Sequence, residues 1–193
     1  MEDIWFVSDP HFGHKNIIQY SNRPFADVDE MNEKMVENWN ALVKPGDRVY
    51  CNGDVAFMPY DKFRAFIWRL NGNIHLVLGN HDKMISEHKN DLLKQGKFAT
   101  IQHYNELKVA GETIILFHYG MRTWNKAHRG SILCYGHSHG SLPPFGRSVD
   151  VGVDCKEITS DYRPIHLDEL LAYMKKREPE IVDHHGKRGD EDG

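Results

Sequence analysis

The sequence of 193 residues has few cysteines, and those it has do not form a pattern typical of a disulfide scaffold. Its three cysteines, Cys51, Cys134 and Cys155, cannot all pair within the chain. Each lies in or beside an apolar run typical of a strand, so we expect buried free thiols in a reducing compartment. The expected location is therefore cytoplasmic.

The chain also lacks a long apolar run, a surplus of positive charge and internal repeats. Its start carries Glu2 and Asp3 in place of a basic segment followed by an apolar stretch, so we expect neither a signal peptide nor a membrane span. A net charge of −4 excludes a broad basic surface, although a local basic groove for nucleic acid stays compatible with it. A hydrophobic content of 40% is enough for the core of one domain.

Five apolar runs, each typical of a β-strand, end in residues that bind metal ions. The central run, 74–78, is followed by the tetrapeptide Gly79-Asn80-His81-Asp82. The carboxyl ends of strands in open α/β sheets form the edge that binds ligands, so five such ends indicate one metal centre. The runs and their polar ends are 4–8 with Asp9 and His11, 48–52 with Asp54, 74–78 with Asn80 and His81, 114–117 with His118, and 132–135 with His137 and His139.

Helices are predicted between these runs from apolar residues at helical spacing. After residue 96 the pattern changes from alternating helices and strands to successive strands, with a hairpin turn at Gly111-Glu112 and a half-buried strand over 148–155. This change favours two packed sheets over one doubly wound sheet. The predicted helices are 13–20, 29–42 with Asp29 as N-cap, 61–70 with Asp61 as N-cap, 84–95 ended by Gly96, and 168–176 with Asp168 as N-cap.

We expect residues 1–176 to form a single domain. Residues 177–193 are charged and almost without apolar side chains, which predicts a disordered tail in which His184 and His185 are solvated.

The predicted ligand types indicate the class of metal. Residues at positions i and i+2 of an extended chain point the same way, so Asp9 and His11 are expected to face one site. Imidazole, carboxylate and amide ligands together suit manganese, iron, zinc, cobalt or nickel better than calcium. The seven candidate ligands, which are the residues above other than His81, are too many for one ion, and with a bridging carboxylate they divide evenly between two.

The motifs resemble those of the calcineurin-like metallophosphoesterase family. The resemblance implies an α/β fold, a four-layer α/β/β/α sandwich of two mixed β-sheets flanked by helices. It also implies two divalent transition-metal ions, with manganese as the first expectation, and it implies that His81 donates a proton to the leaving oxygen or stabilises the phosphoryl group. The implied ligands are Asp9, His11 and His139 for the first ion, Asn80, His118 and His137 for the second, and Asp54 as the bridge between them.

One position departs from the family pattern. Many members carry an acid three residues after the bridging aspartate, where it orients the catalytic histidine, whereas this chain has Phe57. Phenylalanine cannot accept that hydrogen bond. Either another group orients His81, with Asp82 as a candidate, or its role as an acid is weaker than usual.

The activity implied is that of a phosphatase or phosphodiesterase that uses a hydroxide bridging the two ions and forms no covalent intermediate. The chain has no sizeable insertion over the site, so nucleotides or nucleic-acid ends are candidate substrates. The alternative is a non-catalytic, metal-bound interaction module with the same fold. Four residues remain open between phosphate binding and capping or surface roles, namely His14, Arg23, Arg122 and Arg147.

Overall fold

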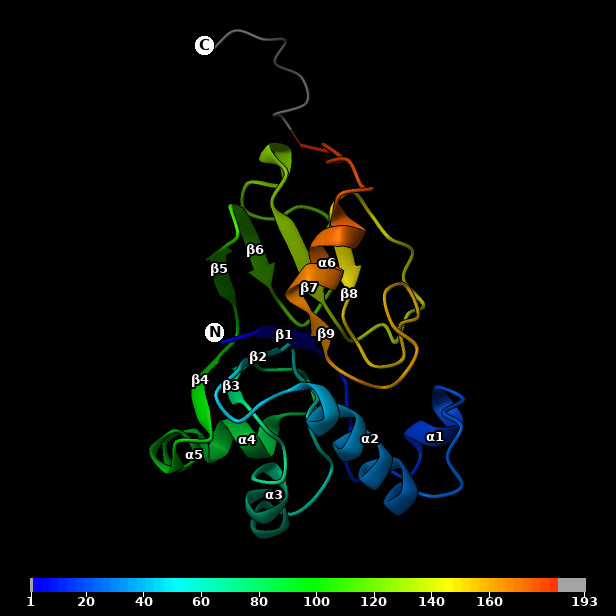
Figure 1. Cartoon of the computed structure of the whole chain (residues 1–193), viewed down its shortest axis with the longest axis vertical. Coiled ribbons are helices and arrows are strands. Elements are labelled where there is room, and N and C mark those ends of the chain that lie inside the picture. The colour runs from blue at the N-terminus through cyan, green and yellow to red at the C-terminus, as the bar shows by residue number, and fades with distance from the viewer. Residues whose placement is uncertain (1, 184–193) are drawn as a thin grey trace, which may run out of the picture.

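The computed structural model describes residues 2–183 and contains two mixed β-sheets that face each other (Figure 1). The five-stranded sheet has the order β4-β3-β2-β1-β9, in which only β9 is antiparallel to its neighbour. Its strands are β1 (Ile4–Val7), β2 (Arg48–Cys51), β3 (Asn73–Val77), β4 (Phe98–Gln102) and β9 (Ile165–His166). The four-stranded sheet has the order β5-β6-β7-β8, in which only β5 is antiparallel. Its strands are β5 (Asn105–Val109), β6 (Glu112–Leu116), β7 (Ile132–Tyr135) and β8 (Ser148–Asp150).

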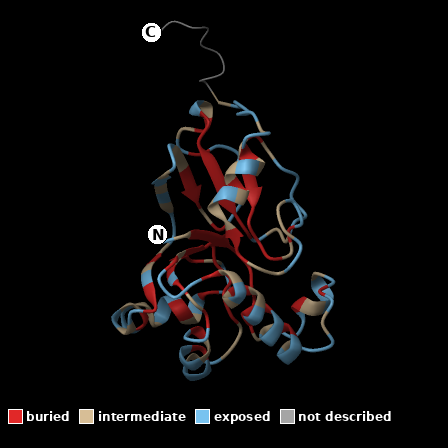
Figure 2. Ribbon diagram, in the orientation of Figure 1, coloured by how far each residue is buried: buried red, intermediate tan, exposed pale blue. Residues whose placement is uncertain are grey.

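Both faces of the five-stranded sheet are buried, which explains why its strands are continuous apolar runs. Trp5 and Val7 of β1 point to the helices outside this sheet, whereas Ile4 and Phe6 point to the core between the sheets. Figure 2 shows buried residues on both sides of this sheet. The helices of the outer layer are α2 (Val28–Leu42), α3 (Tyr60–Ile67), α4 (Lys83–Glu87) and α5 (Lys89–Gln95), and the short α1 (Ile17–Tyr20) precedes them in the chain.

The other side of the molecule has a thinner cover. Helix α6 (Leu167–Met174) sends Leu170 and Met174 into the core between the sheets. In residues 2–183, the outer face of the four-stranded sheet packs against Trp124 and the 3₁₀ helix η1 (Ala127–Arg129). The predicted fold of two mixed sheets flanked by helices is confirmed, with its fourth layer made of one 3₁₀ turn and loops. Within the same range, none of the helices has the length and apolarity to cross a membrane.

Several predicted boundaries are wrong, and local hydrogen bonds explain two of them. Helix α2 has its N-cap two residues earlier than predicted, because the side chain of Asp27 accepts hydrogen bonds from the backbone N–H groups of Asp29 and Glu30. Helix α6 is capped by His166 rather than Asp168, and the Glu169 side chain accepts from the His166 backbone to complete a capping box.

Other elements are shorter than predicted. The predicted helix 84–95 is two helices that meet at His88, whose ring stacks on Tyr60 with a centroid distance of 3.8 Å. Helix α3 begins after Pro59 without a side-chain cap, rather than at the predicted N-cap Asp61. Helix α1 covers only the last turn of the predicted helix 13–20. Strand β8 ends at Asp150, whereas the predicted strand continues to residue 155. The hairpin turn between β5 and β6 is one residue earlier than predicted.

The charged end of the chain lies partly inside the described range. Residues 177–183 have no regular secondary structure, and Arg177 donates from Nε to the carbonyl of Gly146 at 2.6 Å. Residues 184–193, with the predicted solvated histidines His184 and His185, lie outside the described residues.

Candidate metal centre

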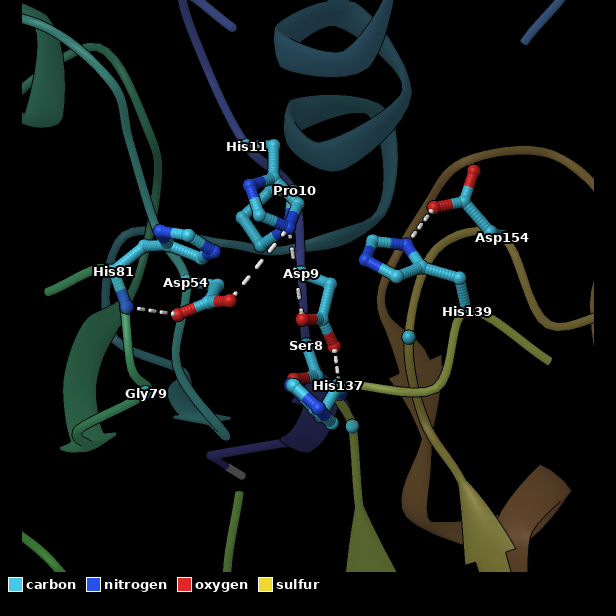
Figure 3. Close-up of polar contacts among 12 residues, drawn as sticks. Ser8, Asp9, Pro10, His11, Asp54, Gly79, His81, His137, His139 and Asp154 are labelled. Carbon is cyan, nitrogen blue, oxygen red and sulfur yellow. Dashed lines mark hydrogen bonds and ion pairs between the residues drawn. The ribbon is translucent and has the colours of Figure 1, made fainter. Parts of the chain in front are cut away.

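The strand ends of the two sheets meet at one place, as the sequence predicts (Figure 3). The carboxyl ends of β1, β2 and β3 supply Asp9, Asp54 and Asn80 from the five-stranded sheet. The ends of β6 and β7 supply His118 and His137 from the other. The potential ligand atoms form two groups, within each of which they lie no more than 4.8 Å apart. The groups are Asp9 with His11 and His139, and Asp54 with His118 and His137.

Asp54 lies between the two groups. Its Oδ2 is 3.8 Å from Nε2 of His11 in the first group and 3.5 Å from Nε2 of His118 in the second. Its Oδ1 accepts the backbone N–H of His81 at 2.8 Å, which holds the carboxylate in place. One carboxylate oxygen therefore faces both groups, as a bridging ligand would.

Asn80 belongs with the second group. Its Oδ1 lies 3.0 Å from Nε2 of His118 and 3.0 Å from Nδ1 of His137. His118 has its other nitrogen, Nδ1, 2.6 Å from the carbonyl oxygen of Asn52. A carbonyl oxygen only accepts, so Nδ1 carries a proton, and in the neutral ring Nε2 presents a lone pair to Asn80 and Asp54. Acceptors that converge in this way fit a cation between them.

The first group fits a cation for a different reason. Asp9 Oδ1 and both ring nitrogens of His11 are buried without a hydrogen-bond partner, and His11 Nε2 lies 3.7 Å from Asp9 Oδ1. Burial raises the pKa of Asp9 to about 8 and lowers the pKa of His11 to about 2. The imidazole is therefore neutral and has a lone pair to offer, while the buried carboxylate needs a positive charge beside it.

His139 completes the first group and is oriented by a residue that the sequence reasoning missed. Its Nδ1 lies 2.7 Å from Oδ2 of Asp154, which leaves Nε2 free for the site. Asp154 also binds Arg23 through two hydrogen bonds of 2.8 Å. In the sequence Asp154 looks like one polar position of an alternating strand, and only the tertiary structure brings it next to His139.

Of the four undecided residues, Arg23 has a structural role, Arg122 and Arg147 do not line the cleft, and His14 lies on the cleft wall. Arg23 is 3% exposed and donates to the carbonyls of Asp9 and Pro10, so it holds the backbone of the loop that carries Asp9 and His11. Arg147 pairs with Glu112 at 3.0 Å, and the guanidinium of Arg122 lies over the Phe145 ring at 4.6 Å.

Asp82 does not orient His81. Its two carboxylate oxygens accept hydrogen bonds from the backbone N–H groups of Asp54, Val55 and Gly79, at 2.8 to 2.9 Å. These bonds tie the loop after β2 to the loop after β3. A Cβ atom at Gly79 would lie 2.2 Å from Oδ1 of Asp54, so this close approach of the two loops requires glycine.

Most of the predicted ligands have a strained backbone. Residues 9 and 11 do not lie on extended chain, and that expectation is wrong. Five of the seven predicted ligands are in the left-handed region, where each side chain other than glycine costs about 1–3 kcal/mol. Their φ angles are 55° for Asp9, 52° for His11, 53° for Asp54, 68° for His137 and 48° for His139. Such strain clusters at functional sites, because the surrounding hydrogen bonds must enforce it.

A cleft of about 600 Å³ opens over the two groups, and His81 lies on its wall together with His14. The ring of His81 is exposed and lies 4.8 Å from the ring of Phe57, the residue in place of the usual acid. Among the described residues, none forms a hydrogen bond with the His81 ring. Phe57 therefore contacts His81 by packing alone.

Comparison with known proteins places this arrangement in a family. The model of the calcineurin-like phosphoesterase superfamily domain matches residues 3–145. The chain belongs to this superfamily. The chain is 33% identical to the uncharacterized protein MJ1445 of Methanocaldococcus jannaschii, and the match covers 91% of this chain and 93% of that protein. The resemblance inferred from the motifs is confirmed.

Two other similar proteins bear on the fold and on the chemistry. A protein of unknown function from Aquifex aeolicus, AQ665, has a crystal structure that matches with a TM-score of 0.67 at 24% identity, over 89% of this chain and 99% of that one. This match concerns the fold alone. The symmetrical bis(5'-nucleosyl)-tetraphosphatase of Cellvibrio japonicus is 28% identical, over 71% of this chain and 50% of that protein.

The contact between Asp154 and His139 predicts an effect on metal affinity. Asp154→Asn removes the charge that fixes the His139 ring, so the affinity for manganese should fall about 10- to 100-fold. Titration calorimetry measures this, with Asp161→Asn as a control at an exposed aspartate that does not line the cleft. Unchanged affinity in a folded Asp154→Asn variant would show that Asp154 does not support the site.

Proposed function

We propose that this protein is a binuclear metal-dependent phosphoesterase that hydrolyses phosphomonoesters or phosphodiesters. The position of Asp54 carries the proposal, because one carboxylate oxygen lies between two groups of nitrogen and oxygen ligands. Family membership supports hydrolysis of phosphate esters. The two ions, when bound, would polarise the phosphoryl oxygens and lower the pKa of water in the site.

We divide the ligands between the two ions as the resemblance implies. We assign Asp54 as the shared ligand of both ions. The mixture of imidazole, carboxylate and amide oxygen makes manganese the first candidate, with iron, zinc, cobalt or nickel as alternatives. The assignment is Asp9, His11 and His139 to the first ion and Asn80, His118 and His137 to the second.

His81 is the candidate catalytic residue. It lines the cleft, its ring is exposed, and its backbone N–H donates to Oδ1 of Asp54. The backbone of the candidate acid–base residue and the shared ligand are thus tied together by one hydrogen bond. An imidazole can give a proton to the departing oxygen near neutral pH. Packing against Phe57 takes the place of the acid that orients this histidine in many relatives.

Nucleotides are the substrates that we favour. The relative in Cellvibrio japonicus is named for a dinucleoside tetraphosphate, and this chain spans half of that protein.

Cys51, Cys134 and Cys155 are free and buried in the structure, as the sequence predicts, which supports a reducing, cytoplasmic location. The alternative of a non-catalytic, metal-bound interaction module is disfavoured, because four of the seven candidate ligands, His11, Asp54, His137 and His139, line an open cleft together with His81.

Hydrolysis of p-nitrophenyl phosphate and bis-p-nitrophenyl phosphate tests the proposed function. The purified protein should release p-nitrophenol from at least one of the two when manganese is added. Chelation should abolish the activity, and manganese should restore it better than calcium because nitrogen ligands do not suit calcium. Full activity after exhaustive chelation would remove the metal mechanism, and two bound ions without turnover would favour the interaction module.

The leaving group tests the role of His81. General acid catalysis typically contributes about 10²- to 10⁴-fold to a rate, but p-nitrophenolate is stable as an anion and gains little from a proton. His81→Ala should therefore slow hydrolysis of a thymidine nucleotide far more than that of a p-nitrophenyl ester. The ratio of the two kcat/KM losses is the measurement, with both ions still bound.

His103→Ala is the matched control, since it removes an exposed imidazole that does not line the cleft. Equal losses on both substrates would mean that His81 stabilises charge on the phosphoryl group instead. If neither substrate slows, His81 is not catalytic.

A further inference from the structure

One wall of the cleft is made by residues that the proposed chemistry does not use. This wall, which we call the α1 wall, consists of His14, Ile17, Tyr20, Ser21 and Asn22, and all five line the cleft. It begins three residues after the ligand His11. Any group attached to a phosphate at the metal centre would have this wall as a neighbour.

Tyr20 is the most unusual residue of the α1 wall. Its side chain is the most exposed of the large hydrophobic residues in the described range, at 72%. Its nearest aromatic neighbour is His14, at a centroid distance of 6.3 Å and an interplanar angle of 58°, too tilted to cover the tyrosine face. A flat apolar surface is therefore presented to solvent at the edge of the site.

The backbone of the α1 wall and the ring of His14 are held in place beside the metal ligands. The His14 ring stacks on Phe57 at 4.0 Å with an interplanar angle of 22°, and it lies 5.5 Å from the ring of His11. The backbone N–H of His14 donates to the carbonyl of His11, and that of Tyr20 donates to Asn16. Phe57 thus supports His81 on one side and the α1 wall on the other. The backbone that carries Tyr20 is therefore already in place beside the site before a ring binds.

Polar groups accompany the rings of the cleft. His14 Nδ1 is buried and has no hydrogen-bond partner. The side chains of Asn22, Ser138 and Ser141 also line the cleft. Aromatic faces with a few convergent polar groups are typical of sites for planar heterocycles, which need both stacking and hydrogen bonds. The hydroxyls of Ser138 and Ser141 already donate to the carbonyls of Gly136 and Ser138, whereas an aliphatic chain would leave His14 Nδ1 without a partner.

We propose that the α1 wall binds the nucleobase attached to the scissile phosphate, with the base stacked on Tyr20. This inference rests on the proposed function, since the metal centre is what holds the phosphate beside the wall. Tyr20 would then determine specificity for nucleosides over other alcohols without taking part in the chemistry.

Binding to the manganese-loaded protein tests the inference independently of turnover. Titration calorimetry would compare thymidine 5'-monophosphate with the matching abasic sugar phosphate, which keeps the phosphate and loses the base. Stacking on an aromatic side chain contributes about 5- to 150-fold to affinity when measured by alanine substitution. Tyr20→Ala should weaken the nucleotide by that factor and leave the abasic compound unchanged, whereas Tyr20→Phe should retain the preference.

Trp68→Ala provides a matched control, because this aromatic residue is 55% exposed and does not line the cleft. Equal weakening of both compounds by Tyr20→Ala, or no weakening, would overturn the inference. Hydrolysis of the same compounds by the unmodified protein tests the proposed function separately. Tighter binding of the nucleotide than of the abasic compound, without hydrolysis of either, would contradict the proposed enzyme activity and support base binding by the α1 wall. A short oligothymidylate with a terminal phosphate distinguishes a free nucleotide from the end of a strand.

Discussion

Acceptor atoms that face one another across Asp54 are the constraint on which the rest of the structure depends. The neutral form of His118 presents the lone pair of Nε2 to two oxygens, Asn80 Oδ1 and Asp54 Oδ2. The neutral His11 faces Asp9 and the same Asp54 oxygen. Lone pairs at these distances repel one another unless positive charge lies between them. Divalent cations in the two groups would convert this repulsion into coordination bonds.

Holding the acceptors together costs free energy, and the scaffold around them offsets that cost. Asp82 binds the backbone of the loop that carries Asp54, and Arg23 binds the carbonyls of Asp9 and Pro10. These contacts enforce left-handed conformations that the ligands would not adopt alone. The charge of Arg23 is itself paired with Asp154, which in turn orients His139. One chain of contacts therefore links the backbone of the first ligand to the side chain of the last.

Most of the centre could be predicted from sequence, because apolar strands that end in Asp, Asn or His leave a local pattern. The residues that hold the ligands in place could not be predicted, because their contacts join positions that are far apart in the sequence. Asp154 lies 15 residues from His139, and Asp82 lies 27 or 28 residues from the backbone groups that it binds in the loop after β2. The break between α4 and α5 was missed for a related reason. Helical periodicity runs through His88, and the stacking of its ring on Tyr60 is a tertiary contact.

The most direct test of the account is a crystal structure of the manganese-loaded protein with anomalous scattering data. Two peaks are expected about 3.5–4 Å apart, both within coordination distance of the Asp54 carboxylate. One should lie among the side chains of Asp9, His11 and His139, and the other among those of Asn80, His118 and His137. A single peak at full occupancy, or two peaks that share no ligand, would contradict it.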